Sequence, residues 1–200
     1  MTEYEEVQKV KYKSFESGNE KWAAGQERCI KTWVIPNIKK GDRILDCACG
    51  DGVGLKVFQD HGFHYLMGIE FEPEKAFRAN RVMSDWGYVI VKDFHIPYPG
   101  WRGLFNTVYS SHSLEHAHDP VTVLMNFHEM LVPGGQLFLI LPFPDAGPDD
   151  AHCGKKVLGT GSWSGLATLW DVLEGAGFEL QEWKLDSWRE PEVWVRARKV

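Results

Sequence analysis

Short apolar segments and helical segments alternate along most of this 200-residue chain, and this alternation restricts the fold more than any other feature. A segment such as 136–143 is apolar and strand-sized, whereas 121–131 has the spacing of a helix. Strands that alternate with helices form a mostly parallel sheet covered on both faces. We therefore predict a doubly wound α/β fold with strands at 43–48, 65–71, 88–94, 104–112 and 136–143, and helices at 55–61, 73–83, 121–131 and 164–175.

The end of the chain follows a different pattern. Residues 178–187 and 193–200 alternate like strands, and only the short segment 188–191 joins them. A connection of this length permits only an antiparallel pair. The sheet should therefore carry one antiparallel strand near an edge. The segment Phe143–Gly161 is long and rich in Pro, Gly and Asp, and long loops in compact domains are commonly functional.

The start of the chain predicts a helix that leads into the domain. Apolar residues recur at near-helical spacing over Trp22–Ile35, and Pro36 and Asn37 end the pattern. We expect a helical lead-in over residues 1–40 and one domain over residues 41–200. The charged N-terminus has no apolar core of a signal peptide.

Charge and cysteine content exclude several classes of function. The formal net charge of −6 gives no electrostatic footprint for nucleic acid, and no apolar run approaches the roughly 20 residues of a membrane span. Cys47 and Cys49 are too close along one strand end to pair comfortably. We expect four reduced thiols, including Cys29 and Cys153, in a cytoplasmic protein without a membrane partner. The sequence leaves the oligomeric state open.

The segment 43–52 carries the strongest chemical signal. An apolar strand ends in Asp46, and the small residues Ala48, Cys49, Gly50 and Gly52 then open directly into a helix. Small residues let a ligand touch the backbone, and the N–H groups at a helix start favour an anion such as a carboxylate. A tight turn without any ligand would give the same local pattern.

Acidic residues follow the next two predicted strands. Glu70 and Phe71 end the second strand, about 20 residues after the glycine turn, where doubly wound nucleotide sites place an acid on a ribose. Asp93 and Phe94 end the third, where a carboxylate can accept from an adenine amino group beneath an aromatic ring. Parallel strands bring these ends to one edge, where open α/β folds bind ligands. Taken singly, each of these residues also suits a solvated strand end or the core.

With these residues in place, the chain resembles the class I S-adenosylmethionine-dependent methyltransferases from about Arg43 to its end. The family's acid-x-Gly-x-Gly-x-Gly signature matches at Asp46, Gly50 and Gly52, with Ala48 in place of the first glycine, and Asn106 stands where the family usually has Asp. Further similar motifs are Leu114-Glu115-His116, Asp119-Pro120, Leu131-Val132-Pro133-Gly134-Gly135-Gln136 and Gly175-Ala176-Gly177-Phe178.

The resemblance implies a seven-stranded sheet of order 3-2-1-4-5-7-6 with the seventh strand antiparallel. It also implies S-adenosylmethionine as cofactor and S-adenosylhomocysteine as product. We expect Asp46 to order the glycine turn, residues 48–52 to meet the methionine moiety, and Ser111 and His112 to close that side. Glu70 is expected on the ribose, Asp93 with Phe94 on the adenine, and His116 is expected to brace the loop against the cofactor. A nicotinamide cofactor needs G-x-G-x-x-G, which the spacing at Gly50, Gly52 and Gly54 lacks.

Histidines near the expected acceptor position are candidates for a general base. His112 follows the fourth strand and His152 lies in the long loop, so either can take a proton near neutral pH. His118, beside Asp119, suits a surface turn. We expect no metal, because the histidines and acids of this region lack a recognisable ligand spacing.

The nine tryptophans do not identify the acceptor. Core packing is the default interpretation for Trp22, Trp33, Trp163 and Trp170, although each could line the cofactor cleft. The sequence thus predicts methyl transfer from S-adenosylmethionine to a small-molecule acceptor. A protein that binds this cofactor without catalysis, and a scaffold without ligand, are the alternatives.

Overall fold

A single seven-stranded sheet organises the molecule in the computed structural model, which describes residues 20–83 and 87–200. Its order is β3-β2-β1-β4-β5-β7-β6, with β7 antiparallel to both neighbours and all other pairs parallel, which confirms the predicted topology. The strands are β1 (Ile44–Cys47), β2 (Leu66–Glu70), β3 (Gly87–Val91), β4 (Phe105–Ser111), β5 (Leu131–Pro142), β6 (Phe178–Asp186) and β7 (Glu192–Lys199).

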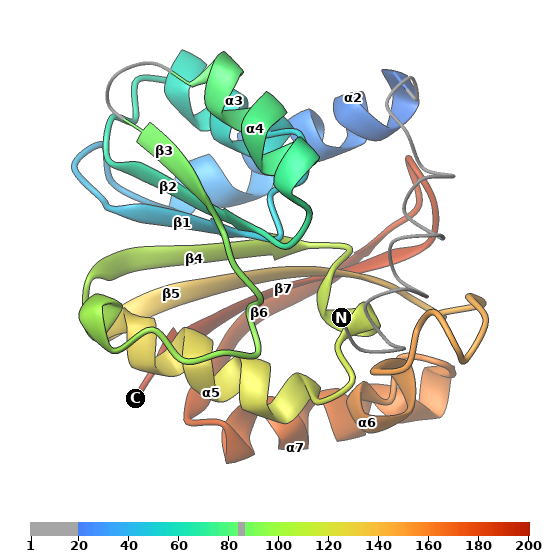
Figure 1. Cartoon of the computed structure of the whole chain (residues 1–200). Helices are drawn as coiled ribbons and strands as arrows, with labels where there is room; N and C mark the ends of the chain where they lie inside the picture. The colour runs from blue at the N-terminus through green and yellow to red at the C-terminus, as the bar shows by residue number, and fades with distance from the viewer. Residues whose placement is uncertain (1–19, 84–86) are drawn as a thin grey trace.

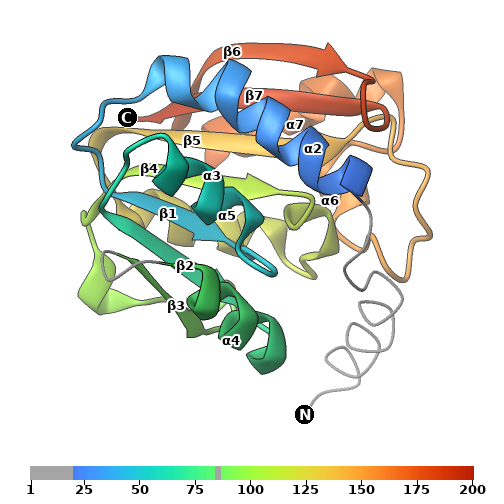
Figure 2. The ribbon, with the colours of Figure 1, turned by 90° about the horizontal axis from the view of Figure 1, so that it is seen from above.

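Helices cover both faces of this sheet, as Figures 1 and 2 show. One face carries α2 (Glu20–Cys29), α3 (Val53–Asp60) and α4 (Pro73–Val82), and the other carries α5 (Pro120–Met130), α6 (Lys155–Leu158) and α7 (Leu166–Gly175). Each layer encloses its own apolar core. Buried side chains of α2, α3 and α4 pack on one face, and those of α5 and α7 on the other. The sheet is therefore buried on both sides, as its near-continuous apolar strands require.

Several predicted elements have different limits in the structure, and the third strand, predicted to reach residue 94, ends at Val91. The lead-in helix does not run unbroken to residue 35, because α2 passes into a π-helical turn (Ile30–Val34) and a 3-10 turn (Ile35–Asn37). Strand β5 begins at Leu131, so the Pro-Gly-Gly step lies within it, and its register with β4 shifts there. The long loop after β5 contains the short helix α6. The part of the lead-in before residue 20 lies outside the described residues.

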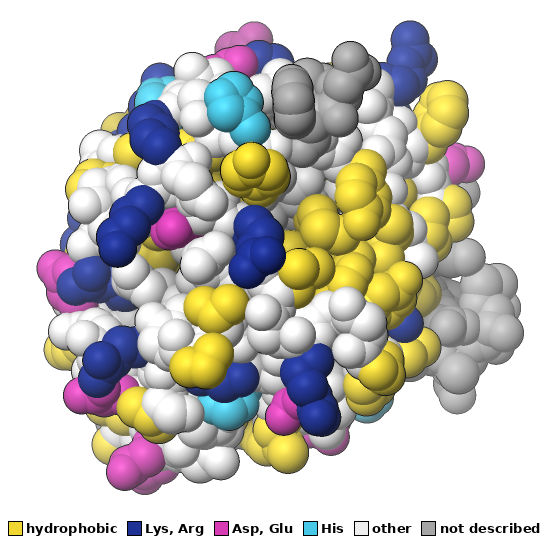
Figure 3. All heavy atoms as spheres, turned by 90° about the vertical axis from the view of Figure 1, so that its left-hand side faces the viewer, with side chains coloured by type: hydrophobic (Ala, Val, Ile, Leu, Met, Phe, Trp, Pro, Cys, Tyr) yellow, Lys and Arg dark blue, Asp and Glu magenta, His cyan; other side chains and the backbone are white. Residues whose placement is uncertain are grey.

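The edge strand β3 leaves apolar side chains uncovered. Tyr88 and Val91 are both exposed on it, and Figure 3 shows hydrophobic side chains gathered over part of the face on this side of the molecule. The four cysteines all lie in the described residues, and none of them forms a disulfide bond. Within the described ranges, no helix has the length and apolar character to cross a membrane.

Candidate functional site

The turn after β1 holds its backbone in a conformation that favours glycine. Ala48, Gly50 and Gly52 all have positive φ angles, of 59°, 56° and 83°. A Cβ on Gly52 would lie 3.1 Å from the Ala79 Cα of α4, whereas a Cβ on Gly50 would meet no atom within 4 Å. The turn is therefore closed toward α4 and open at Gly50. Ala48 adopts a left-handed conformation that costs an L-residue roughly 1–2 kcal/mol.

Asp46 lies buried beneath this turn. Its Oδ2 has no hydrogen-bond partner among the described residues, and only 1% of the residue is exposed. A Cβ on Gly54, in the first turn of α3, would come within 2.5 Å of that oxygen, so only glycine fits there. Burial, with repulsion from Glu70, raises the pKa of Asp46 well above its ordinary value. A buried carboxyl with an unused oxygen is costly unless a donor or cation completes it.

Glu70, at the end of β2, is joined directly to the turn. Its Oε2 accepts from the Gly50 N–H at 2.8 Å, and its Oε1 accepts from the Glu72 N–H at 2.9 Å. Burial raises the pKa of this carboxyl despite those two bonds. Each oxygen keeps a further lone pair for a ligand. The structure thus brings the first two predicted elements into hydrogen-bond contact, and Phe71 follows them at the same edge.

Asp93 and Phe94 lie just beyond the end of β3. The Asp93 Oδ1 accepts from the backbone N–H of His95 at 2.9 Å and contacts its Nδ1 at 2.8 Å. Partial burial raises the pKa of Asp93, but the His95 hydrogen bonds outweigh burial and leave it below its ordinary value. The Phe94 ring lies nearly parallel to that of Phe127, with centroids 6.4 Å apart. The exposed His118 stacks on His95, with ring centroids 3.8 Å apart.

Two histidines and a carboxylate form one half of a polar cluster beyond β4 and β5. The His152 Nδ1 lies 2.7 Å and 2.8 Å from the two oxygens of the buried Asp145, which also accepts from the Gly147 N–H. A Cβ on Gly147 would overlap the His152 imidazole, so the absent side chain makes room for the ring. His116 meets His152 edge to face at 4.8 Å. Its Nδ1 contacts the Ala151 carbonyl at 2.9 Å, and burial lowers its pKa to about 4.

His112 forms the other half of the cluster, with side chains of the β6–β7 turn. It follows Ser111 at the end of β4, with a φ of 50°. Its Nδ1 lies 3.2 Å from the Glu190 Oε1, and its Nε2 lies 3.3 Å from the Glu192 Oε1. Burial lowers the pKa of His112 to about 4, so the ring is neutral at pH 7. The Trp22 indole of α2 packs edge to face on this imidazole at 4.6 Å.

Glu192 is a buried carboxylate with fixed partners. The Arg189 Nε donates to its Oε1 at 2.7 Å, and the Trp194 Nε1 donates to its Oε2 at 2.7 Å. Burial raises its pKa, but His112 and Arg189 outweigh burial and bring it to about 2. Arg189 also stacks on Trp22, and a Cβ on Gly25 of α2 would lie 2.7 Å from its Cδ. These contacts hold α2 against the β6–β7 turn.

The sequence analysis missed Arg189, Glu190 and Glu192, because it treated 188–191 only as a connection between strands. One signal was available. In a sheet with an antiparallel last strand, the turn that enters this strand lies at the carboxyl edge, where ligands bind. Three charged residues within four positions at such a turn indicate that the turn contributes side chains to the site as well as connecting two strands. Of the tryptophans, Trp22 lies at this cluster, whereas Trp33 is core and contacts Trp194.

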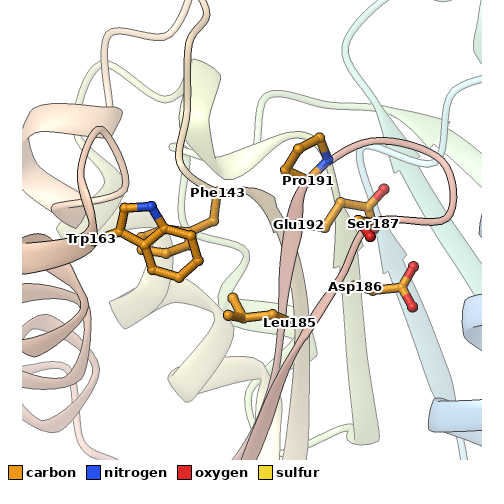
Figure 4. Close-up of a pocket in the computed structure, with 7 residues that line it drawn as sticks. All are labelled: Phe143, Trp163, Leu185, Asp186, Ser187, Pro191 and Glu192. Atoms are coloured by element: carbon orange, nitrogen blue, oxygen red, sulfur yellow. The ribbon is translucent and has the colours of Figure 1, made fainter.

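A pocket of about 260 Å³ lies beside the same turn (Figure 4). Phe143 and Trp163 form one side, with ring centroids 5.1 Å apart in an edge-to-face arrangement. The β6–β7 hairpin forms the other side, with Leu185 and Pro191. Trp163 therefore lines a pocket, while Trp170 lies against Trp183 on the β6 side of the sheet.

Comparisons with known proteins agree with this architecture. A family model described as a methyltransferase domain matches residues 16–183. A 27-O-demethylrifamycin SV methyltransferase of Amycolatopsis mediterranei is 28% identical over 130 residues, which cover 60% of this chain and 47% of that protein. A ubiquinone biosynthesis O-methyltransferase of Xanthomonas euvesicatoria is 32% identical over 105 residues, which cover 50% and 42%. The chain thus spans about half the length of these relatives.

Solved structures show the same fold at low identity. An S-adenosylmethionine-dependent methyltransferase from Mesorhizobium loti superposes with a TM-score of 0.68 at 19% identity, covering 86% of this chain and 98% of the other. A geranyl diphosphate methyltransferase in complex with its cofactor gives 0.68 at 14% identity, covering 89% and 85%. The chain therefore belongs to the methyltransferase-domain family and has the fold of the S-adenosylmethionine-dependent methyltransferases.

Proposed function

We propose that this domain binds S-adenosylmethionine across the carboxyl ends of β1, β2 and β3 and methylates a small-molecule hydroxyl beside β4, β5 and the β6–β7 turn. The observation that carries this proposal is the hydrogen bond from the Gly50 N–H to Glu70, which joins the open glycine turn to a carboxylate suited to a ribose. When bound, the cofactor supplies a methyl group on a sulfonium, ready for in-line displacement.

The cofactor side of the site fits the chemistry of this ligand. The unpartnered Oδ2 of Asp46 offers a buried acceptor beneath the turn, and a methionine ammonium there would favour the ionised carboxylate that burial alone disfavours. The open space at Gly50 lets a ligand lie against the backbone. Glu70 keeps lone pairs for two ribose hydroxyls, and Asp93 with Phe94 offers an acceptor and a ring for the adenine. Ala48, Cys49, Ser111 and His116 complete the proposed contacts around the methionine.

The acceptor side carries a histidine prepared to take a proton. With Nδ1–H donated to Asp145, the Nε2 of His152 is the basic nitrogen, as in other carboxylate-oriented histidines. The bound cofactor would supply the methyl group to the acceptor oxygen, leaving as S-adenosylhomocysteine, and the hydroxyl proton would pass to Nε2 of His152. Asp145 then stabilises the imidazolium. His112, the other predicted base, suits the proton-acceptor role less well, because burial lowers its pKa to about 4 despite the nearby Glu192.

The proposed acceptor is an aromatic hydroxyl compound. Two relatives in this family are named for methylation at oxygen, in rifamycin and ubiquinone biosynthesis. The pocket between Trp163 and Pro191 offers apolar walls for a planar ring, next to the charged cluster. We therefore use phenols with adjacent hydroxyls as first probes.

Cofactor binding is tested by titration calorimetry with S-adenosylhomocysteine. A hydrogen bond to a charged group contributes about 1.5–3 kcal/mol, so Glu70→Gln should weaken binding roughly ten- to a hundredfold. Glu74→Gln removes the same charge from the exposed first turn of α4 and serves as the control. Equal affinities for wild type and Glu70→Gln would remove Glu70 from the site.

Catalysis is tested separately from binding. Transfer of labelled methyl from S-adenosylmethionine to 3,4-dihydroxybenzoate, or to compounds of a cell extract, would show an enzyme. Binding of S-adenosylhomocysteine with no labelled product in either assay would instead indicate a protein that binds the cofactor without catalysis. The residue that supports this alternative is Ala48, which has a strained backbone where the family has glycine.

A further inference from the structure

His112 has a buried ring nitrogen that the described residues leave unused. Its side chain is 7% exposed, and its Nε2 makes no hydrogen bond with correct geometry to any described residue. The nearest carboxylate oxygen, Glu192 Oε1, lies 3.3 Å away, whereas a charge-assisted N–H···O bond is about 2.7–2.9 Å long. Burying an unpartnered polar atom is costly, so this nitrogen indicates a missing partner.

The spacing of the neighbouring donors suits a metal ion. His112, Glu190 and Glu192 form one group among the described residues whose ligand atoms lie within 4.8 Å of one another. Two donors that each lie about 2.1 Å from one ion are separated by about 3.0–3.4 Å. The 3.3 Å between the His112 Nε2 and the Glu192 Oε1 falls in that range. The Glu190 Oε1 lies 3.2 Å from the other ring nitrogen, Nδ1, so Glu190, whose side chain is 41% exposed, would have to turn toward Nε2 to complete the set.

Outer contacts already hold two of the three donors in place. Arg189 and Trp194 each bond one oxygen of Glu192, and each oxygen keeps a lone pair for a metal. The Trp22 indole packs edge to face on the His112 ring, whose Nδ1 lies 3.2 Å from Glu190 and 3.7 Å from the buried Glu115, the latter too far for a hydrogen bond. Such outer partners are characteristic of metal-binding histidines and carboxylates.

The charges around the cluster favour a cation. The carboxyl groups of Glu192 and Asp145 both act on Glu190, and Arg189 and His152 oppose them.

We propose that His112, Glu190 and Glu192 bind one divalent transition-metal ion, such as Zn²⁺ or Mn²⁺. One imidazole with two carboxylates is a mixed donor set that suits such ions better than Ca²⁺. Among the described residues, no short motif carries these ligands, because His112 lies 78 positions before Glu190 in the sequence. The ion would lie beside His152 and bind the acceptor oxygen, a role that rests on the proposed function, whereas the binding itself does not.

The test is metal binding by the full chain, stripped with EDTA and titrated with Zn²⁺ or Mn²⁺ in a calorimeter. We expect one saturable equivalent per chain, at least about tenfold weaker in Glu190→Gln. Glu179→Gln is the matched control, because it removes the same charge from an exposed ion pair on β6. An anomalous difference peak between the three side chains in metal-soaked crystals would locate the ion.

Three outcomes would overturn the proposal: no saturable binding, equal binding by wild type and Glu190→Gln, or an anomalous peak elsewhere. S-adenosylhomocysteine binding is measured on the same samples. If that ligand binds and metal does not, only the metal site is wrong. If metal binds and the nucleoside ligand does not, the proposed function is wrong and the metal site stands.

Discussion

The two halves of the carboxyl edge are built in different ways. On the β1–β3 side, single residues at strand ends meet backbone N–H groups, as in the Gly50–Glu70 bond. On the β4–β7 side, side chains from distant segments contact one another, as His112 contacts Glu190 and Glu192. The geometry of the first half is set by the backbone conformation of its turns, whereas that of the second half requires each buried charge to have an opposite charge beside it. Substitutions in the first half should therefore act through backbone strain, and those in the second half through unpaired buried charge.

Arg189→Ala tests the dependence of the second half on charge, and we expect it to have the largest effect. It leaves the buried Glu192 carboxylate without its cation, a loss of about 3–5 kcal/mol in unfolding free energy. Denaturant unfolding measures this loss. Arg198→Ala, which breaks the exposed pair with Glu179, should cost no more than about 1 kcal/mol. Similar losses in both variants would contradict the contrast between the halves.

Gly147→Ala separates the two halves functionally. The new Cβ would overlap the His152 ring and displace it, and misplacing a catalytic group by about 1 Å can cost on the order of a hundredfold in kcat. The affinity for S-adenosylhomocysteine should change much less, because His116 is the one proposed cofactor contact among the described residues shown to pack on the His152 ring. Gly161→Ala is the control in the same loop, since its Cβ meets no atom within 4 Å. A comparably large change of nucleoside affinity in Gly147→Ala would show that the halves are coupled.

The partly buried His116 makes the stability of the second half depend on pH. Its pKa is about 4 in the folded protein against 6.5 unfolded, so the unfolded state binds more protons between these values. The stability that its neutral form contributes is complete above pH 6.5 and is lost as the pH falls toward 4, by about 1.4 kcal/mol per pH unit. Between pH 6.5 and 4, the unfolding free energy of His116→Gln should fall less steeply with falling pH than that of the wild type, by about 1.4 kcal/mol per pH unit. Above pH 7 the curves for the two proteins should be parallel.

Ala48→Gly tests the conformational half and should have the smallest effect. It removes left-handed strain of roughly 1–2 kcal/mol but adds chain entropy of about 0.4–1 kcal/mol to the unfolded state. We expect a net gain of about 0.5–1 kcal/mol in thermal or chemical unfolding. Ala167→Gly, on an exposed position of α7, should be destabilising instead. A loss of stability at position 48 would mean that the Ala48 methyl makes contacts that outweigh its strain.

This contrast also explains how far the sequence alone could lead. The strand order was implied by the resemblance to the methyltransferase family, whereas the closeness of Asp46 and Glu70 followed from parallel strands that end at one edge of the sheet. The contacts of His112 with the β6–β7 turn could not be predicted, because no periodicity links residues 78 positions apart. The ends of some helices and strands also differ from the predicted ones, because tertiary contacts decide where an element ends. The lead-in helix, for example, passes into a π-helical turn after α2.

The docking of α2 has a consequence for how the chain is made. This helix leaves the ribosome before the sheet, yet its partners Arg189 and Trp194 lie far later in the sequence, Arg189 being 167 positions after Trp22. Until they emerge, the apolar side of α2 lacks part of its cover and is open to chaperones or to unwanted association. Ribosome-bound chains that stop before β7 should therefore be the form of this protein most prone to aggregate.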